Sequence, residues 1–305
     1  FFSGRKKDAT LWCIPLAITQ GKETKYHLME RQQESIAREK GLTLLNKNQV
    51  GFYRLQYDNT LFQEQIKAFQ EKQLGTLDKI GLVADTFALA ESNYTKMDQF
   101  LDVLQYVRDE NNYTLWADIA GSISQLQMLF THHDFSDDLD ALCRWAFAHV
   151  LKKVGWEEKK GEQHTQILLR LSVLGMTGFS KEESVQAEAK KRFQEYLRTK
   201  TLNPNLRGVV YSLAAWTGNT ETWEQLRQMH EAATLQEEKI RVLAAMCMFQ
   251  QKELLQKTLA YSLSSAVRSQ DSPIGVARIA RNPFGMELAW EFLKEHWSEF
   301  MKRYG

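Results

Sequence analysis

Residues 94–107 read YTKMDQFLDVLQYV, and the spacing of their apolar side chains decides the fold class. These side chains recur at intervals of three and four residues, which places them on one face of an α-helix. The positions concerned are Met97, Phe100, Leu101, Leu104 and Val107. The last segment of the chain extends the same pattern over Ala289, Phe292, Leu293, His296, Trp297, Phe300, Met301 and Tyr304. Each stretch predicts an amphipathic helix that buries one face against a neighbour.

The helical pattern repeats along most of the chain. From residue 61 onward we expect roughly a dozen helices joined by short polar turns, and pairs of them recur about every 35–45 residues. No side-chain signature repeats with the pairs. This organisation predicts a curved, HEAT- or armadillo-like α-helical superhelix, in which each pair buries its apolar stripe against the next. A compact, non-repeating bundle is the alternative.

The first 58 residues have a different pattern. Short runs of β-branched, aromatic and apolar residues are separated by polar turns, which is typical of strands. The runs are LWCIPLAIT (11–19), KYHLM (25–29), LTLLN (42–46) and VGFYRLQYD (50–58). In the last run, alternation places Tyr53, Leu55 and Tyr57 on one face. We therefore predict a mainly α protein with a small N-terminal β-sandwich at 1–58 and a helical domain at 59–305.

Composition and charge narrow the class of partner. The 305 residues are 43% hydrophobic and 25% charged, with a formal net charge of +1. Such a balance is typical of a soluble globular protein and predicts neither nucleic-acid nor membrane binding. The apolar stretches are shorter than the ~20 residues that span a bilayer. Because the chain opens on FFSGRK without an initiator Met, we expect it to be a piece of a longer protein.

The three cysteines are Cys13, Cys143 and Cys247, which lie far apart among apolar neighbours. An odd number at such spacings favours free thiols over disulfides, and free thiols are typical of a reducing compartment. We therefore predict a cytoplasmic location.

Two histidine motifs suggest a metal site but lack the required spacing. HExxH places two histidines one helical turn apart, whereas HEAAT (230–234) has Thr234 at the second position. In THHDFSDDLD (131–140), the adjacent His132 and His133 point in different directions, and the Asp and Ser residues favour a helix start. A metal hydrolase that uses this second motif is the weakest hypothesis. NPFGMEL (282–288) is similar to a GxMEN substrate-binding motif, but Met286 follows Gly285 directly and Leu288 stands where Asn is required. The sequence therefore indicates no catalytic, cofactor or metal residues.

Several segments, in order and spacing, resemble the C-terminal region of M1-family zinc aminopeptidases. They are NNYTLWADIAGSISQL (111–126), VGWEEKKGEQHTQILLRLSVLG (154–175), LQEEKIRVLAAM (235–246), SSAVRSQDSPIG (264–275) and RNPFGMELAWEFLKEHW (281–297). FYRLQY and VRSQD are closest to the puromycin-sensitive branch. LWCIPLAIT and VGFYRLQYD resemble the small β-sandwich that follows the catalytic domain in that family. The resemblance covers nearly all of the chain.

The resemblance implies a non-catalytic part that caps the active site of its parent enzyme and encloses the peptide channel. The parent would remove N-terminal amino acids from peptides with a zinc ion held in its catalytic domain. The implied partners are the N-terminal and catalytic domains of the same polypeptide, together with peptide substrates. The alternative is a freestanding α-solenoid scaffold that binds another protein.

Cationic side chains are the natural partners of a peptide carboxylate, because a guanidinium can pair with it through two hydrogen bonds. The candidates for contact with the substrate tail are Arg281, Arg278 and Arg170. Ion pairs between helices are the alternative for each. By resemblance to the family's VRSQD turn, Arg268, Gln270 and Asp271 are expected to join two helix ends through an Arg–Asp pair. Arg54 is expected to anchor the β part.

Overall fold

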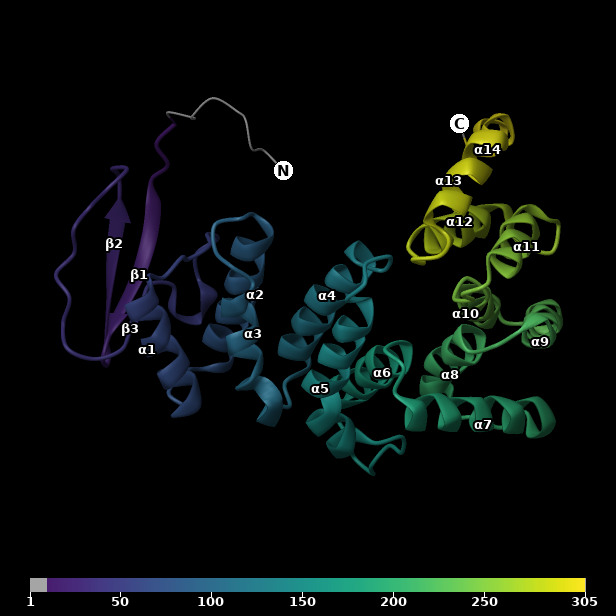
Figure 1. Ribbon diagram of the computed structural model, residues 1–305, viewed down its shortest axis with the longest axis horizontal. Coiled ribbons are helices and arrows are strands. Elements are labelled where there is room, and N and C mark those ends of the chain that lie inside the picture. The colour runs from purple at the N-terminus through teal and green to yellow at the C-terminus, as the bar shows by residue number, and fades with distance from the viewer. Residues whose placement is uncertain (1–9, 305) are drawn as a thin grey trace. The chain divides into compact units, whose positions relative to one another are not determined.

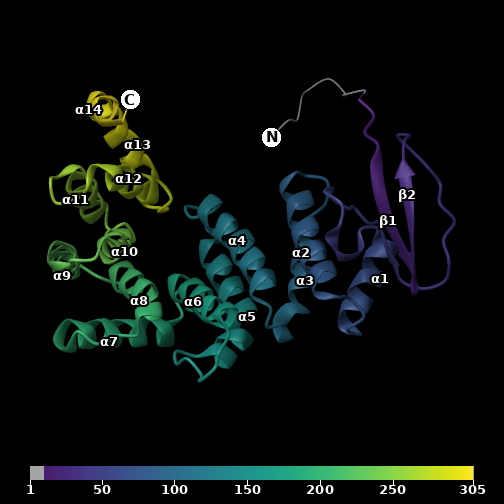
Figure 2. The ribbon, with the colours of Figure 1, turned by 180° about the vertical axis from the view of Figure 1, so that it is seen from behind.

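The computed structural model describes residues 10–304. The chain divides into two compact units with the bounds Phe1–Ser122 and Ile123–Gly305. Helix α4 (Tyr113–Leu129) contains the boundary between them. The described residues are mainly helical with one small sheet near the N-terminus, so the predicted fold class is confirmed (Figures 1 and 2).

The sheet of the first unit is a single layer with strand order β2-β1-β3. β1 (Ile14–Gln20) and β2 (Glu23–Met29) form an antiparallel hairpin, and β3 (Thr43–Leu44) pairs with the opposite edge of β1. The turn between β1 and β2 contains Gly21, whose φ of 61° is a conformation that glycine adopts without strain. Two of the predicted runs, 11–19 and 25–29, therefore supply the main strands.

The strand predicted at residues 50–58 does not form, and this part of the prediction is wrong. The burial of this segment alternates as expected, with Tyr53, Leu55 and Tyr57 less exposed than the residues between them. However, it has no ladder partner within residues 10–304. Its Leu55 N–H donates instead to the Asp85 carboxylate at 3.2 Å, and the Arg54 guanidinium pairs with the same carboxylate at 3.0 Å. Arg54 and Leu55 thus attach the segment to a helix and not to the sheet.

Helices complete the first unit. They are α1 (Asn59–Gln70), α2 (Thr76–Glu91), α3 (Asp98–Leu104) and the first part of α4, with 3-10 turns at Lys47–Gln49 and Val107–Asp109. Phe100, Leu104 and Val107 are fully buried, as the spacing in residues 94–107 predicts. Asp85, which holds the extended segment, belongs to α2 and is itself buried.

Helix pairs build the second unit. After the end of α4, its helices are α5 (Ser136–Val154), α6 (His164–Phe179), α7 (Glu183–Thr199), α8 (Pro204–Trp216), α9 (Thr220–Ala232), α10 (Gln236–Met246), α11 (Lys252–Leu263), α12 (Ser272–Ala280), α13 (Met286–Glu295) and α14 (Trp297–Tyr304). A 3-10 turn at Ser269–Asp271 precedes α12.

The helices of the second unit are arranged in two rows. Helices α5, α7, α9 and α11 each pack against the helix that follows them in sequence. The following helices, α6, α8, α10 and α12, also pack on one another in order and form a continuous row (Figure 1). Their shared core contains large side chains such as Phe193, Tyr211 and Leu255. This stacking of pairs is the organisation of an α-helical repeat array.

The final amphipathic stretch differs from its prediction. The helix is interrupted at His296, between α13 and α14. The His296 ring stacks on the Phe292 ring at a centroid distance of 4.1 Å. Ala289 and Phe300 are buried as expected, but Trp297 and Met301 are 55% and 50% exposed. The single long stripe predicted for this segment is therefore wrong, because the helix is interrupted at His296 and part of the stripe is exposed to solvent.

Candidate functional site

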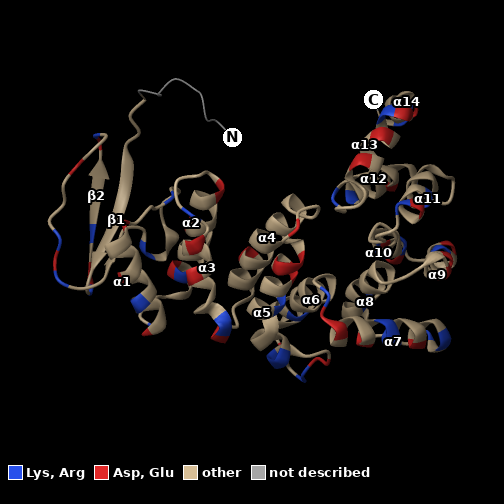
Figure 3. Cartoon of the chain, in the orientation of Figure 1, with Lys and Arg blue, Asp and Glu red and all other residues tan. Residues whose placement is uncertain are grey.

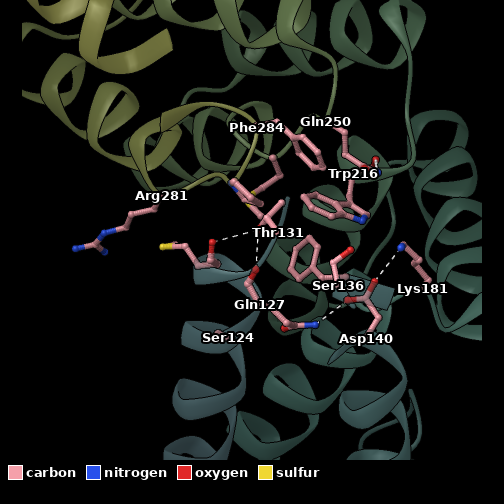
Figure 4. Close-up of a pocket in the computed structure, with 14 residues that line it drawn as sticks. Ser124, Gln127, Thr131, Ser136, Asp140, Lys181, Trp216, Gln250, Arg281 and Phe284 are labelled. Carbon is pink, nitrogen blue, oxygen red and sulfur yellow. Dashed lines mark hydrogen bonds and ion pairs between the residues drawn. The ribbon is translucent and has the colours of Figure 1, made fainter. Parts of the chain in front are cut away.

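A cavity of about 270 Å³ lies in the second unit, at the C-terminal ends of the helices in the row α6, α8, α10 and α12. Its walls come from the C-terminal ends of α4, α6 and α8, from the start of α5 and from the turns that follow α10 and α12 (Figure 4). Helices of the row run in the same direction, so residues at their C-terminal ends gather although they are distant in sequence. The cavity therefore combines side chains from Ser124 to Phe284 within one unit.

Three aromatic side chains form one wall of the cavity. Trp216, the last residue of α8, lies between Phe179 and Phe284. The ring centroids of Phe179 and Trp216 are 5.3 Å apart at 81°, and those of Trp216 and Phe284 are 6.0 Å apart at 48°. Such edge-to-face and tilted arrangements are the favourable ones for aromatic pairs. Met128 and Met248 extend this apolar surface.

The opposite wall is polar and its charges are largely balanced. The Asp140 carboxylate accepts a hydrogen bond from the Gln127 amide at 2.8 Å and pairs with the Lys181 ammonium at 2.9 Å. Lys181 also pairs with Asp137, and these two carboxylates, Asp137 first, raise the pKa of Lys181 above its usual value. Gln127 further donates to the Ser180 hydroxyl at 2.9 Å. These interactions hold the polar side chains in place, and they occupy the Asp140 carboxylate.

Arg281 is a second cation of the cavity lining and lies in the turn after α12. Its side chain is exposed and, within residues 10–304, its guanidinium forms no hydrogen bond or ion pair (Figure 4). Arg278 is also exposed, but it does not line the cavity. Of the three arginines predicted to contact a substrate tail, only Arg281 lies at this site.

Arg170 has a structural position instead. Its side chain is fully buried in α6, and its guanidinium donates two hydrogen bonds of 2.7 Å to the Glu162 carboxylate. Its Nε donates to the Val154 carbonyl at 3.1 Å. These bonds hold the α5–α6 connection on α6 and lower the pKa of Glu162. No part of Arg170 reaches solvent, and its ion pair joins α6 to the α5–α6 connection rather than two helices.

The VRSQD turn is joined to the helix array through Asp271. This carboxylate is buried and accepts a hydrogen bond from the Gln236 amide at the start of α10. Arg268 contributes its carbonyl oxygen, which accepts from the Asp271 N–H at 2.9 Å, while its side chain and that of Gln270 are exposed. Asp271 therefore links this turn to the start of α10 through the Gln236 amide.

The two histidine motifs do not converge on a metal ion. His230 is buried near the end of α9, and its Nδ1 lies 2.8 Å from the Tyr261 hydroxyl. Burial lowers the pKa of His230, so the neutral ring is favoured. His132 and His133 are exposed beside the start of α5. Among residues 10–304, no group of three His, Cys, Asp or Glu side chains is arranged to hold an ion.

Sequence reasoning missed the aromatic wall. Phe179 and Trp216 are the last residues of α6 and α8, and Phe284 lies in the turn after α12. An aromatic residue near the end of alternate helices is therefore a signal that the sequence carried.

The stacked helix pairs place the chain in the class of α-helical repeat proteins. More specifically, the chain belongs to the ERAP1-like C-terminal domain family, whose sequence profile matches residues 42–305. The resemblance to the C-terminal region of M1 aminopeptidases is thereby confirmed.

Three relatives show how much of a longer protein the chain represents. It is 28% identical to the alanine/arginine aminopeptidase of Saccharomyces cerevisiae over 98% of this chain and 35% of the relative. It is 26% identical to aminopeptidase M1-B of Oryza sativa subsp. japonica, over 99% of this chain and 37% of the relative. It is 26% identical to the glutamyl aminopeptidase of Bitis rhinoceros, over 96% of this chain and 32% of the relative. The chain therefore spans about a third of the length of these relatives.

Charge and hydropathy of the described residues add two observations. Basic and acidic side chains are interspersed along the helices of each unit (Figure 3). Across residues 10–304, every helix is too short or too polar to cross a lipid bilayer.

Proposed function

We propose that this chain is the non-catalytic C-terminal part of a zinc-dependent M1-type aminopeptidase. It caps the active site of the catalytic part and encloses the channel through which peptides reach it. Membership of the ERAP1-like C-terminal domain family supports the proposal, as does the coverage of about a third of each aminopeptidase relative. The parent enzyme removes N-terminal amino acids from peptides and holds its zinc outside this chain.

The site on this chain binds the end of the peptide that is remote from the scissile bond. The observation that carries this proposal is the position of Arg281 beside an apolar cavity walled by Phe179, Trp216 and Phe284. An unpaired guanidinium suits a terminal carboxylate, and the aromatic wall suits the apolar side chain of the last residue. Because Lys181 is already paired with two aspartates, Arg281 supplies the charge that a ligand can use.

The partners follow from the same proposal. They are the N-terminal and catalytic domains of one polypeptide and the peptide substrates that this polypeptide encloses. We also propose a cytoplasmic location, which is supported by three free cysteines, of which Cys143 and Cys247 are buried. Such thiols are typical of proteins kept in a reducing compartment.

Calorimetric titration of the purified chain tests the peptide site. The probes are N-acetyl-Ala-Ala-Ala-Phe with a free carboxylate and the same peptide as a carboxamide. We expect the free acid to bind more tightly, and we expect Arg281→Gln to weaken its binding by about fivefold, the effect of about 1 kcal/mol from an exposed ion pair. Carboxamide binding should be unchanged by this substitution.

Arg278→Gln is the matched control, because Arg278 is an exposed arginine three residues before Arg281 that does not line the cavity. This variant should bind both peptides as the unsubstituted chain does. Equal affinity of the unsubstituted chain for the acid and the amide would contradict the proposed carboxylate site. It would favour a scaffold that binds another protein through a different surface.

A further inference from the structure

Asn282 has a buried side-chain amide whose two N–H donors and carbonyl oxygen all bind backbone groups, in two different turns. Its side chain is 2% exposed. Its Nδ2 donates to the Cys247 carbonyl at 2.9 Å and to the Phe249 carbonyl at 2.8 Å. Its Oδ1 accepts from the Phe284 N–H at 2.9 Å. An asparagine amide has two N–H donors and a carbonyl oxygen that can accept two hydrogen bonds, so both donors are engaged and the oxygen accepts one bond.

These bonds connect the turn after α12 to the turn after α10. Carbonyl groups at the end of a helix lack partners within it, and the Asn282 donors satisfy two of them just beyond α10. The same device occurs one step earlier in the row. There, the Gln250 amide donates to the Trp216 carbonyl at 2.8 Å, and the Gln251 amide donates to the Gly218 carbonyl at 2.9 Å. Side-chain amides thus join the turn after α8 to the turn after α10, and the turn after α10 to the turn after α12.

The residues on both sides of Asn282 belong to the candidate site. Arg281 precedes it, and Phe284, whose N–H donates to the Asn282 Oδ1, belongs to the aromatic wall. The turn closes tightly at Gly285, where an added Cβ would lie 2.6 Å from the Ile279 carbonyl oxygen. Backbone geometry therefore fixes the shape of this turn, and the Asn282 side chain fixes where the turn lies relative to α10.

We propose that Asn282 is a positioning residue for the cavity: by joining the two turns, it holds Arg281 and Phe284 at the distance from Trp216 and Met248 that a peptide end requires. This inference rests on the proposed function of the cavity as a peptide-end site. Asn282 does not contact the ligand. It acts through the two neighbours that do.

The test uses Asn282→Asp and Asn282→Ala in the full chain, with the acid and amide peptides named above as probes. Asp keeps the side-chain volume and the acceptor for the Phe284 N–H but removes both donors. We expect each variant to lower affinity for the free acid about fivefold, as Arg281→Gln does. Adding Arg281→Gln to either variant should cause no further loss, because the guanidinium is already displaced.

Gln251→Ala is the matched control, since it also removes a side-chain amide that caps a backbone carbonyl but concerns a residue outside the cavity lining. It should leave the ratio of acid to amide affinity unchanged. Hydrogen exchange of the free protein supplies a second readout: amides at 281–286 and 247–251 should exchange faster in the Asn282 variants. Circular dichroism confirms that each variant is folded, and Asn282→Asp is the variant used if Asn282→Ala is not.

The outcomes separate this inference from the proposed function. If the unsubstituted chain shows no preference for the acid, the proposed function fails, and the positioning role fails with it. If the preference exists and the Asn282 variants keep it, while Arg281→Gln still costs about fivefold in their background, Asn282 is merely structural and the inference alone is overturned.

Discussion

Replacing Arg170 with methionine tests the distinction between a structural arginine and a ligand contact. The substitution keeps an unbranched side chain in a fully buried position but removes the guanidinium. It eliminates two hydrogen bonds to the Glu162 carboxylate and one to the Val154 carbonyl. Glu162 is then left without its partner in a site where its side chain is 12% exposed.

The expected loss follows from the burial of this pair. Removing one partner of a buried ion pair costs about 3–5 kcal/mol, because the other charge stays behind without compensation. Glu162 retains some access to water, so we expect a value near the lower limit, about 3 kcal/mol. Glu162→Gln keeps a carbonyl acceptor for one N–H of Arg170 but leaves the fully buried guanidinium without a counter-charge, so it should cost a similar amount, about 3 kcal/mol.

Urea unfolding followed by tryptophan fluorescence and circular dichroism measures these losses. With a slope of about 2–3 kcal/mol/M, a loss of 3 kcal/mol lowers the midpoint by roughly 1–1.5 M. The difference between the unsubstituted chain and Arg170→Met should shrink in acid. The pKa of folded Glu162 is lowered by Arg170, so the stabilisation is complete above the unfolded value and is lost as pH falls through the folded one.

The opposite pattern would refute this reasoning. If Arg170→Met leaves the urea midpoint unchanged but abolishes the preference for a free peptide carboxylate, Arg170 contacts the ligand and the buried arrangement is incorrect. The double substitution Arg170→Met with Glu162→Met provides a further check. It should recover part of the lost stability, because no unpaired charge remains in the buried site.

Two more predictions concern packing and pH. Gly275→Ala in α12 should lower the free energy of unfolding by about 1–3 kcal/mol in urea titrations, since the new Cβ would lie 2.3 Å from the Ser262 hydroxyl oxygen. Gly121→Ala, with no neighbouring atom within 4 Å, should be neutral or slightly stabilising, and equal losses for both would contradict this. Stability should also fall as pH drops below 6.5, by up to about 1.4 kcal/mol per pH unit, because burial lowers the pKa of His230 and the unfolded chain takes up the proton first. His230→Gln should remove that dependence in thermal unfolding measured between pH 7.5 and 5.5, and a dependence unchanged in the variant would refute its assignment to His230.

Helical periodicity predicted the architecture because burial of one face governs where each helix packs. The stripe containing Phe100 and Leu104 identified a helix and its core face, and the change of pattern near residue 58 identified the β part. The strand at 50–58 could not be predicted correctly from alternation alone. Its alternation is real, but whether an extended segment joins a sheet depends on a partner, and here Asp85 binds its backbone instead.

The candidate site was only partly predictable for a similar reason. An arginine near the final helices was expected to face a peptide, and Arg281 does line the cavity. Sequence could not distinguish it from Arg170, because an apolar neighbourhood does not reveal that a loop will return with Glu162 as partner. Nor could it reveal Asn282, whose partners are backbone carbonyls 33 and 35 residues away. Such contacts are properties of the stacked array and not of any local pattern.

Hydrolysis of aminoacyl 4-nitroanilides by the purified chain, with added zinc, most directly tests whether this polypeptide is the non-catalytic part of an aminopeptidase. We expect no release of nitroaniline above the buffer rate for alanyl, arginyl or leucyl substrates. Release that co-elutes with the chain, and that stops when a chelator removes the metal, would contradict the account.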